Sequence, residues 1–445
     1  MPISPARAAA FDILLRVERE SSYASELLHA DTYNRLSPQD HALTTELVMG
    51  VLRWRSGLDA DIAQASSQPL SKLDLEILIA LRLALYQFRS LDRIPQRAAL
   101  HESVELVKRA RKRSAAPFVN AVLRKLAAAA PTPTSSPDSA EAIASTLAHP
   151  LWLVERWIDR YGVAAATQIC RHDQLIPPTT IRLRTPTAEA ELHAHGIKLE
   201  PGPILASARR VLSGDITNTR AFRNADIVIQ DEASQLVAIL IGRAQGDLRI
   251  LDCCAAPGGK TLAIADQNPT AEITAVEIHP HRARLLQKLV SGSKRKITTL
   301  IADATNLPFT HPYHRVLADV PCSGTGTLSR NPEIKWRLKP GDLSDLQACQ
   351  RALLRSALAH LSPGGRLVYS TCSLEEEENE DVVEDILAHD NSIRPLDCRS
   401  ELDKLKHAGD LVWPDPALLT RGPYFRTMPG LHPCDGFFAA ILEKR

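Results

Sequence analysis

The chain has 445 residues, and its 53 Lys and Arg nearly balance its 52 Asp and Glu, which leaves a formal net charge of +1. Hydrophobic residues make up 44% of the sequence, enough for more than one core, and the length predicts about three domains. No apolar run approaches the roughly 18 residues of a membrane span, and the N-terminus lacks a signal-peptide pattern. We therefore expect a cytoplasmic protein that has no membrane partner.

The eight cysteines follow neither a zinc pattern nor a disulfide pattern. None belongs to a C-x-x-C pair, so we expect no metal site, and a disulfide framework is not expected in a chain of this length. A free cysteine is usually a small buried hydrophobic residue, and this is our expectation for Cys170, Cys349 and Cys398. The other five lie in the segments considered below.

Residues 1–130 are predicted to form an all-helical bundle, because apolar residues recur at helical spacing and no strand alternation interrupts them. The clearest segments are 8–17, 42–52, 73–88 and 98–107. The region holds 18 Lys and Arg against 14 Asp and Glu, with a tight basic run from Lys108 to Arg113. Such a run can bind phosphates or can be an ordinary solvated helix face, and charge alone favours neither.

Residues 131–149 are predicted to be a linker, because 127–139 is rich in Ala, Pro, Thr and Ser and has almost no large apolar side chain. Beyond it, residues 150–161 are expected to be helical and residues 179–183 to form a strand. We predict a small α+β module over residues 150–245.

Residues 246–445 begin with a strand, a glycine-rich turn and a helix. The segment from Leu248 to Asp252 is mostly apolar, as a buried strand should be. The turn from Cys253 to Thr261 follows it and leads into the apolar run 262–265. Small residues let a ligand approach the backbone, and the free N–H groups of the helix suit an anionic group such as a carboxylate. The turn is neither the dinucleotide G-x-G-x-x-G nor the phosphate-binding loop.

Four predicted strands end on or near an acidic residue, namely Asp252, Glu277, Asp303 and Asp319. Any one of them could simply cap a helix. Four of them in register with a glycine-rich turn favour a binding site instead, since ligands of open α/β sheets bind at the carboxyl edge of the strands, where an acid after the second strand holds ribose hydroxyls. We therefore expect an α/β, Rossmann-like domain.

Three segments of this domain resemble the signatures of S-adenosylmethionine-dependent RNA cytosine carbon-5 methyltransferases. They are Cys254 to Lys260, Asp319 to Ser323 and Ser370 to Ser373. Residues 328–336 and 435–438 match the same family, so the resemblance covers roughly residues 150–445. It implies a class I methyltransferase domain over 246–445 whose cofactor is S-adenosyl-L-methionine.

The chemistry of that family needs two thiols. Carbon 5 of cytosine is a poor nucleophile, so a thiolate first adds to carbon 6 and forms a covalent adduct. Once carbon 5 is methylated it must lose its proton before the thiol can leave, which requires a second group. By resemblance, Cys372 is the nucleophile, Cys322 promotes product release, Asp319 hydrogen-bonds the ring near nitrogen 3, and Lys260 lies between cofactor and base.

The resemblance also assigns the cofactor contacts. It gives the turn to the methionine end, Glu277 to the ribose and Asp303 to the adenine, and it includes Asp319 among the cofactor-binding residues. The turn residues are Cys254, Ala255, Ala256, Pro257, Gly258, Gly259 and Lys260. Glu277 departs from the more usual Asp by one methylene. Cys253 and Cys254 are expected to be packing residues, and the placement of Cys434, at a second departure from the family pattern, is open.

The helical front region resembles the NusB family of RNA-binding domains over residues 46–54, 81–87 and 118–124. This combination is typical of the RsmB type of cytosine methyltransferase, which implies 16S rRNA or a small ribosomal subunit precursor as the partner. Trp54 and Tyr86 could stack on bases, but core packing is the expected use. In the α+β module the candidate RNA contacts are Arg182, Arg184, Arg209 and Arg210, and residues 230–234 should lead into a helix beside the cofactor.

The acidic run Glu375 to Glu378, with Asn379 and Glu380, is interpreted as a solvated helix start without a catalytic role. Two alternatives stay open for the whole chain. The same chemistry could act on tRNA or another rRNA site, or the protein could be a non-catalytic NusB-like assembly factor, although the intact pair Cys322 and Cys372 argues against this. Nothing in the chain demands more than a monomer.

Overall fold

The computed structural model describes residues 3–20, 22–33, 35–129, 139–243, 246 and 248–445. Its internal contacts divide the chain into two compact units. Unit 1 comprises Met1–Ile176 and Leu328–Arg337, and unit 2 comprises Pro177–Thr327 and Leu338–Arg445. The predicted domain borders remain predictions. Residues 131–138 of the predicted linker lie outside the described residues, and within the rest of it residues 140–146 form a helix.

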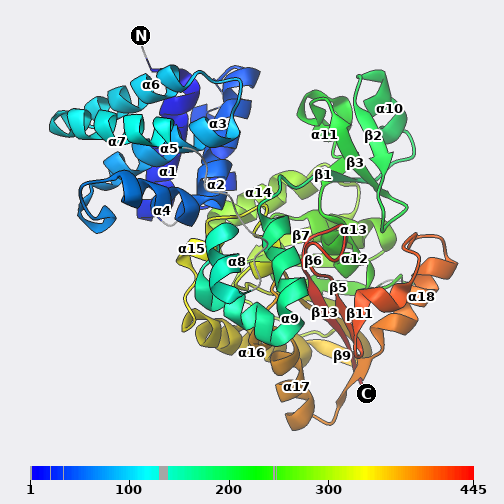
Figure 1. Ribbon diagram of the computed structural model, residues 1–445. Coiled ribbons are helices and arrows are strands. Elements are labelled where there is room, and N and C mark those ends of the chain that lie inside the picture. Colours follow the sequence, from blue (N-terminus) through cyan, green and yellow to red (C-terminus); the bar gives the residue numbers. More distant parts are fainter. Residues whose placement is uncertain (1–2, 21, 34, 130–138, 244–245, 247) are drawn as a thin grey trace. The chain divides into compact units, whose positions relative to one another are not determined.

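Unit 1 is helical, as predicted (Figure 1). Three of the four segments with helical spacing fall within a helix, and the fourth, 73–88, begins two residues before α5. Helix α3 starts at a Ser37 cap whose hydroxyl accepts the N–H of Asp40. The helices are α1 (Pro5–Glu20), α2 (Ala24–Leu28), α3 (Pro38–Arg53), α4 (Arg55–Ala65), α5 (Leu75–Ser90), α6 (Gln96–Arg109), α7 (Ala116–Ala128), α8 (Ala140–Thr146), α9 (Leu151–Asp173) and α15 (Ile334–Arg337).

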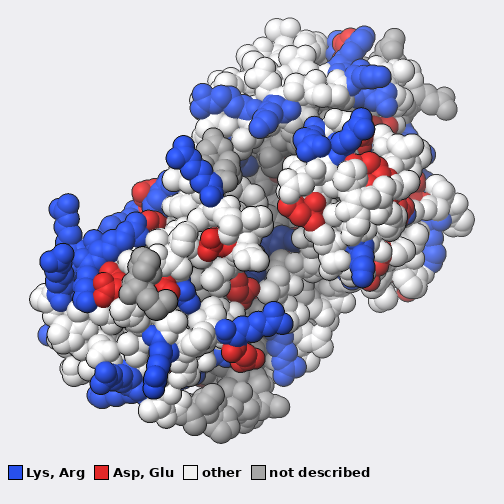
Figure 2. Space-filling view, turned by 90° about the horizontal axis from the view of Figure 1, so that it is seen from above, with Lys and Arg blue, Asp and Glu red and all other residues white. Residues whose placement is uncertain are grey.

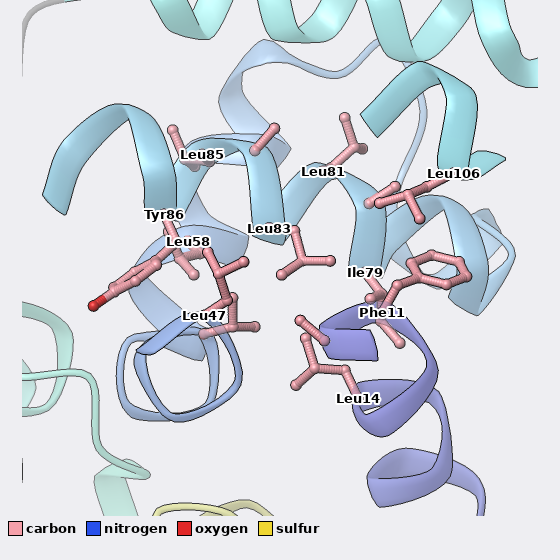
Figure 3. Packing of buried hydrophobic residues seen from close by; sticks show 14 of the residues in the cluster. Phe11, Leu14, Leu47, Leu58, Ile79, Leu81, Leu83, Leu85, Tyr86 and Leu106 are labelled. Atoms are coloured by element: carbon pink, nitrogen blue, oxygen red, sulfur yellow. The ribbon is translucent and has the colours of Figure 1, made fainter. Parts of the chain in front are cut away.

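Helix α5 lies at the centre of the packing, because it buries side chains from Ile77 to Gln87 on nearly all sides. Figure 3 shows Ile79 and Leu83 of α5 on the side of Phe11 and Leu14 of α1. Helix α3 approaches closely at Gly50, where an added Cβ would lie 2.0 Å from Cζ of Tyr86. A larger residue at this position would displace the ring, so the glycine permits the contact between the two helices.

The segment Leu328–Arg337 belongs to unit 1 although both of its flanks belong to unit 2. Lys335 is buried and its Nζ donates to the carbonyl of Arg53 at 3.0 Å. The carboxylate of Glu333 accepts the N–H of Ala24 at 2.8 Å, and the indole N–H of Trp336 donates to the carbonyl of Leu52 at 2.6 Å. Polar contacts to the backbone of the helical unit therefore hold this segment in place.

Unit 2 begins with a four-stranded antiparallel sheet in the order β2-β3-β1-β4. Its strands are β1 (Thr179–Leu183), β2 (Lys198–Pro201), β3 (Ala208–Ser213) and β4 (Ile227–Ile229), and helices α10 (Ala188–Ala194) and α11 (Arg220–Arg223) accompany it. Residues 230–231 then lead into helix α12 (Glu232–Ile239), whose N-terminal N–H of Ala233 is capped by Asp231. The predicted α+β character of this region is confirmed.

The larger sheet runs in the order β11-β12-β13-β9-β8-β5-β6-β7, with β10 also paired to β13. Strands β7, β6, β5, β8 and β9 are parallel, whereas β13 is antiparallel to β9. The strand order reverses between β5 and β8, which creates the topological switch point where doubly wound sheets bind ligands. The strands are β5 (Arg249–Asp252), β6 (Glu272–Glu277), β7 (Lys296–Ile301), β8 (Tyr313–Asp319), β9 (Leu361–Thr371), β10 (Ile393–Leu396), β11 (Thr420–Arg421), β12 (Tyr424–Arg426) and β13 (Phe438–Lys444).

Apolar side chains on the two faces of this sheet belong to separate clusters, one containing Leu317 and Val368 and the other containing Val316 and Leu367. A sheet buried on both faces is typical of the doubly wound α/β class, so the predicted Rossmann-like domain is confirmed. Its helices are α13 (Gly259–Gln267), α14 (Pro280–Val290), α16 (Asp342–Ala359), α17 (Glu380–His389) and α18 (Cys398–His407). Among the described residues, no helix has both the length and the apolar character that crossing a membrane requires.

Candidate active site

The acidic residues predicted at strand ends lie along the carboxyl edge of the large sheet. Asp252, Glu277 and Asp319 are the last residues of β5, β6 and β8, and Asp303 lies two residues beyond the end of β7. The parallel register pairs Asp252 with Leu317, and Asp319 with Ser370 of β9. Cys372 follows β9 directly, so the switch point brings the acidic residues and a thiol to the same edge.

The glycine-rich turn connects β5 to α13 and is fastened to the sheet. The N–H of Cys253 donates to the carbonyl of Leu317 at 2.9 Å, and that of Ala255 donates to the carbonyl of Val276 at 2.8 Å. Gly258 caps α13 with a φ of 113°, and a Cβ there would lie 2.9 Å from Cδ1 of Leu286. Glycine is needed at this position because φ is positive and because there is no room for a Cβ.

Asp252 is buried beneath this turn. Its Oδ2 accepts the hydroxyl of Thr261 at 2.7 Å, while its Oδ1 has no hydrogen-bond partner among the described residues. Burial, with a smaller contribution from the charge of Asp319, raises the pKa of Asp252 to about 7. The carboxyl group can therefore carry a proton near neutral pH, which reduces the cost of the unpartnered oxygen.

Lys260 and Asp319 form an ion pair at the same edge. Nζ of Lys260 lies 2.8 Å from Oδ2 of Asp319, whose Oδ1 accepts the hydroxyl of Ser370 at 2.7 Å. Nζ also lies 5.1 Å from the ring centroid of Phe437. Burial is the largest single influence and lowers the pKa of Lys260, but the charge and the hydrogen bond of Asp319, together with the other acidic groups nearby, raise this pKa overall, so the ammonium stays charged.

The two predicted catalytic thiols are adjacent. Sγ of Cys322 and Sγ of Cys372 are 3.4 Å apart, and both residues are partly exposed. Their segments are also joined through the backbone, because Val320 donates to Ser370 at 3.0 Å and Gly326 donates to Cys372 at 2.9 Å. The hydrogen bond to Cys372, and then burial, raise the pKa of Cys322 well above its usual range. Cys322 therefore keeps its proton at neutral pH.

The acidic run after Cys372 leads into helix α17, as expected, but the expectation that it is solvated is wrong for most of its residues. Glu375, Glu378, Asn379 and Glu380 are all buried. Asn379 accepts the hydroxyl of Thr371 at 2.5 Å and donates to the carbonyl of Ser373 at 3.0 Å, so it holds the residues on both sides of Cys372. The carboxylate of Glu378 contacts both thiol-bearing segments. These side chains can be buried because hydrogen-bond donors inside the fold pair with their oxygen atoms.

Glu277 and Asp303 differ in their surroundings. Glu277 is buried, its Oε1 accepts the N–H of His279 at 2.9 Å, and its Oε2 lies 4.0 Å from Nε of Arg282. Arg282 also donates to the carbonyl of Ala256 in the glycine-rich turn at 3.2 Å. Asp303 is exposed and closes its own turn by accepting the N–H and the hydroxyl of Thr305, which lower its pKa. Their roles toward the ribose and the adenine remain predictions.

All four arginines suggested as RNA contacts are engaged in ion pairs within the fold. Arg182 and Arg184 both bind Asp266, at 2.7 and 2.8 Å, and Arg182 is buried. Arg209 binds Glu189 at 2.6 Å. Arg210 lies 3.9 Å from Glu200 and donates to the carbonyl of Pro433 at 2.7 Å. The predicted use of Arg182 in particular does not fit its burial.

The remaining cysteines mostly pack as expected. Cys170, Cys253 and Cys398 are buried, but Cys349 is exposed on α16, so the expectation that it is a core residue is wrong. A position on the solvent side of an amphipathic helix explains this difference. Cys434 is buried within the cluster that contains Phe437, which settles its placement as a packed residue.

The basic run of unit 1 is only partly free to bind a partner. Lys108 pairs with Glu105 at 2.7 Å, and Arg109 pairs with Asp12 at 2.7 Å. Figure 2 shows several groups of Lys and Arg on the face in view, with Asp and Glu among them. Tyr86 is buried, as expected, and donates its hydroxyl to Glu46 at 2.5 Å.

Comparisons with known proteins agree with this architecture. Residues 238–443 match the family model described as 16S rRNA methyltransferase RsmB/F, and residues 4–128 match the NusB family. A probable ribosomal RNA small subunit methyltransferase B of Bacillus subtilis is 33% identical over 99% of this chain and 98% of its own length. The chain belongs to the RsmB/F family.

Further relatives of the family extend the match over the whole chain. The ribosomal RNA small subunit methyltransferase B of Xanthomonas campestris is 29% identical over 98% of this chain and 97% of its own. The solved structure of PH0851 has a TM-score of 0.81 at 24% identity and covers 100% of both chains. NSun6 from Pyrococcus horikoshii, solved with SFG, has a TM-score of 0.55 at 20% identity over 66% of this chain and 98% of its own. These solved structures show the fold.

Sequence reasoning found the two thiols, the Lys260–Asp319 pair and the turn, and missed Glu378 and Asn379. Their signal is weak, because a run of acidic residues favours a solvated surface and the partners of Glu378 include Ser323, which is distant in sequence. Within the described part of the chain, no group of three or more His, Cys, Asp or Glu is arranged to hold a metal ion.

Proposed function

We propose that the protein methylates carbon 5 of a specific cytosine in 16S rRNA with S-adenosyl-L-methionine, through a covalent adduct between Cys372 and the base. The observation that carries this proposal is the distance of 3.4 Å between the Sγ atoms of Cys322 and Cys372, beside the ion pair of Lys260 and Asp319. The residues that carry the resemblance therefore lie together at the ligand-binding edge of the sheet.

The turn and its neighbours fit the cofactor. Gly258 and Gly259 carry no side chain at the start of α13, where N–H groups can bind the methionine carboxylate. Glu277, which ends the adjacent strand, would bind the ribose hydroxyls. When bound, S-adenosyl-L-methionine supplies an electrophilic methyl group.

The two thiols have different roles in the proposed reaction. Sγ of Cys372, as a thiolate, forms a bond to carbon 6, and the ring's electron density moves to carbon 5, which can then accept the methyl group. Cys322 keeps its proton because its pKa is raised, and it can donate a hydrogen bond to Sγ of Cys372 at 3.4 Å. Carbon 5 then gives up its proton to a water molecule, the double bond between carbons 5 and 6 forms again, and the bond between Sγ and carbon 6 breaks with its electron pair returning to Cys372. Cys322 assists this release.

The Lys260–Asp319 pair fixes the base. Oδ1 of Asp319 accepts from Ser370 and Oδ2 lies against Nζ of Lys260, so the carboxylate is held in one orientation beside the thiols. Such an orientation suits a hydrogen bond to the protonated nitrogen 3 of the adduct, which stabilises the charge that develops there.

The test is methyl transfer from labelled S-adenosyl-L-methionine to unmethylated 16S rRNA and, in parallel, to tRNA, with the modified nucleoside identified by mass. The proposal predicts 5-methylcytidine in 16S rRNA and none in tRNA. Product only in tRNA would retain the chemistry and overturn the substrate. No product in either would favour a non-catalytic assembly factor.

A further inference from the structure

The carboxylate of Glu378 lies between the two segments that carry the thiols. Its Oε1 accepts the N–H of Ser323 at 2.7 Å, and its Oε2 accepts the hydroxyls of Ser323 and of Ser373, the latter at 2.5 Å. Ser323 follows Cys322 directly, and Ser373 follows Cys372 directly. One buried carboxylate therefore binds the residue next to each sulfur.

Helix α16 adds a third connection to the same carboxylate. Nε2 of Gln350 donates to Oε1 of Glu378 at 2.9 Å and to the carbonyl of Pro321 at 2.9 Å. Pro321 immediately precedes Cys322, so this segment is held on both sides of the thiol. The hydroxyl of Tyr369 on β9 donates to the backbone carbonyl of Glu378 at 2.6 Å, which fixes the turn that presents the carboxylate.

A carboxylate suits this position better than an amide. It is an acceptor at both oxygens and can take about four hydrogen bonds, and here it receives four, from Ser323 twice, Ser373 and Gln350. A Gln side chain would place an NH₂ group where one pair of donors now points, so at least one donor would have to turn away. Glu378 is 0% exposed, so water cannot replace the lost bond.

We propose that Glu378 is a positioning residue that sets the separation of the Sγ atoms of Cys322 and Cys372 and thereby the rate of methyl transfer. This inference rests on the proposed function for its catalytic consequence, whereas the geometric part concerns the protein alone. A displacement of about 1 Å between reacting groups can reduce a rate by about 100-fold, and the carboxylate is one residue away from each sulfur.

The first experiment compares Glu378→Gln with the matched control Glu377→Gln, a partly exposed neighbour in the same turn. We expect Glu378→Gln to lower kcat on 16S rRNA by about 10- to 100-fold, with KM for RNA and Kd for S-adenosyl-L-methionine within about twofold of wild type. Glu377→Gln should match wild type in all three. A lower kcat with an unchanged KM would indicate misplaced thiols, whereas a raised KM would indicate weaker binding of RNA.

The second experiment measures the thiol separation without RNA. Diamide accepts two electrons and two protons from a pair of thiols, which become a disulfide while diamide becomes a hydrazine. We expect wild type and Glu377→Gln to form the Cys322–Cys372 disulfide rapidly, as identified by peptide mass, and Glu378→Gln to form it at least about fivefold more slowly, because the sulfurs must approach to about 2 Å.

Wild-type kcat together with wild-type cross-linking in Glu378→Gln would overturn the proposal, even if its unfolding temperature fell. If Glu378→Gln does not fold, Ser373→Ala removes one of the four donors and keeps the carboxylate, and it should slow both processes in the same direction. If the wild-type protein forms the disulfide rapidly but methylates no RNA, the proposed function is refuted. The proposal that Glu378 sets the separation of the two sulfur atoms would not be affected by that result.

Discussion

Replacement of Lys335 by Met should change the pH dependence of folding stability. Lys335 is buried in unit 1, near Asp173, Cys170 and Arg53, and burial lowers its pKa from 10.5 to about 7. Between these values the unfolded side chain binds more protons than the folded one, so the free energy of unfolding rises with pH. The penalty for burying the charge is complete below about pH 7 and disappears above the unfolded pKa.

The size of the effect follows from the shift. One pKa unit corresponds to about 1.4 kcal/mol, and the two titration curves together give a gain of about 2 kcal/mol between about pH 7 and pH 9. Lys335→Met lacks this gain. Chemical denaturation of the full-length protein at both values of pH, with hydrogen exchange in unit 1 as the probe, measures it. A variant whose unfolding free energy changes with pH as wild type does would refute the reasoning.

Two further substitutions test the site. Lys260→Met should lower kcat by about 100-fold in the methyl-transfer assay, because Asp319 loses the partner that orients it, while circular dichroism stays unchanged; activity within about twofold of wild type would contradict this. Gly258→Ala should weaken S-adenosyl-L-methionine binding in calorimetry and cost about 1–3 kcal/mol of stability, because φ is 113° and the new Cβ would lie 2.9 Å from Leu286. Unchanged affinity would show that the turn does not contact the cofactor.

Local patterns predicted the parts of the site that come from single segments. The helical bundle, the strand ends at Asp252 and Asp319 and the glycine-rich turn all follow from periodicity and small residues, because these features are determined by neighbours in sequence. The meeting of Cys322 with Cys372 was predicted through resemblance, and the strand order explains it, since β8 and β9 are adjacent.

The parts that escaped prediction depend on distant partners. Arg182 was predicted to contact RNA, but it forms an ion pair with Asp266 inside unit 2. The burial of Glu378 was not predicted, because the four hydrogen bonds to its carboxylate come from three residues in other parts of the site. Nothing in the sequence around those residues indicates that they bind a buried carboxylate. The place of Leu328–Arg337 in unit 1 is a similar case, since Lys335 binds the carbonyl of Arg53, far away in sequence. Burial of a charged side chain is decided by such partners rather than by its own segment.

The central claim is that Cys372 attacks the base and Cys322 releases it. Its most direct test is denaturing electrophoresis of Cys322→Ala and Cys372→Ala after incubation with 16S rRNA and S-adenosyl-L-methionine. Cys322→Ala should accumulate a covalent protein–RNA adduct that survives denaturation, whereas Cys372→Ala should form none. An adduct with Cys372→Ala and none with Cys322→Ala would contradict the assignment.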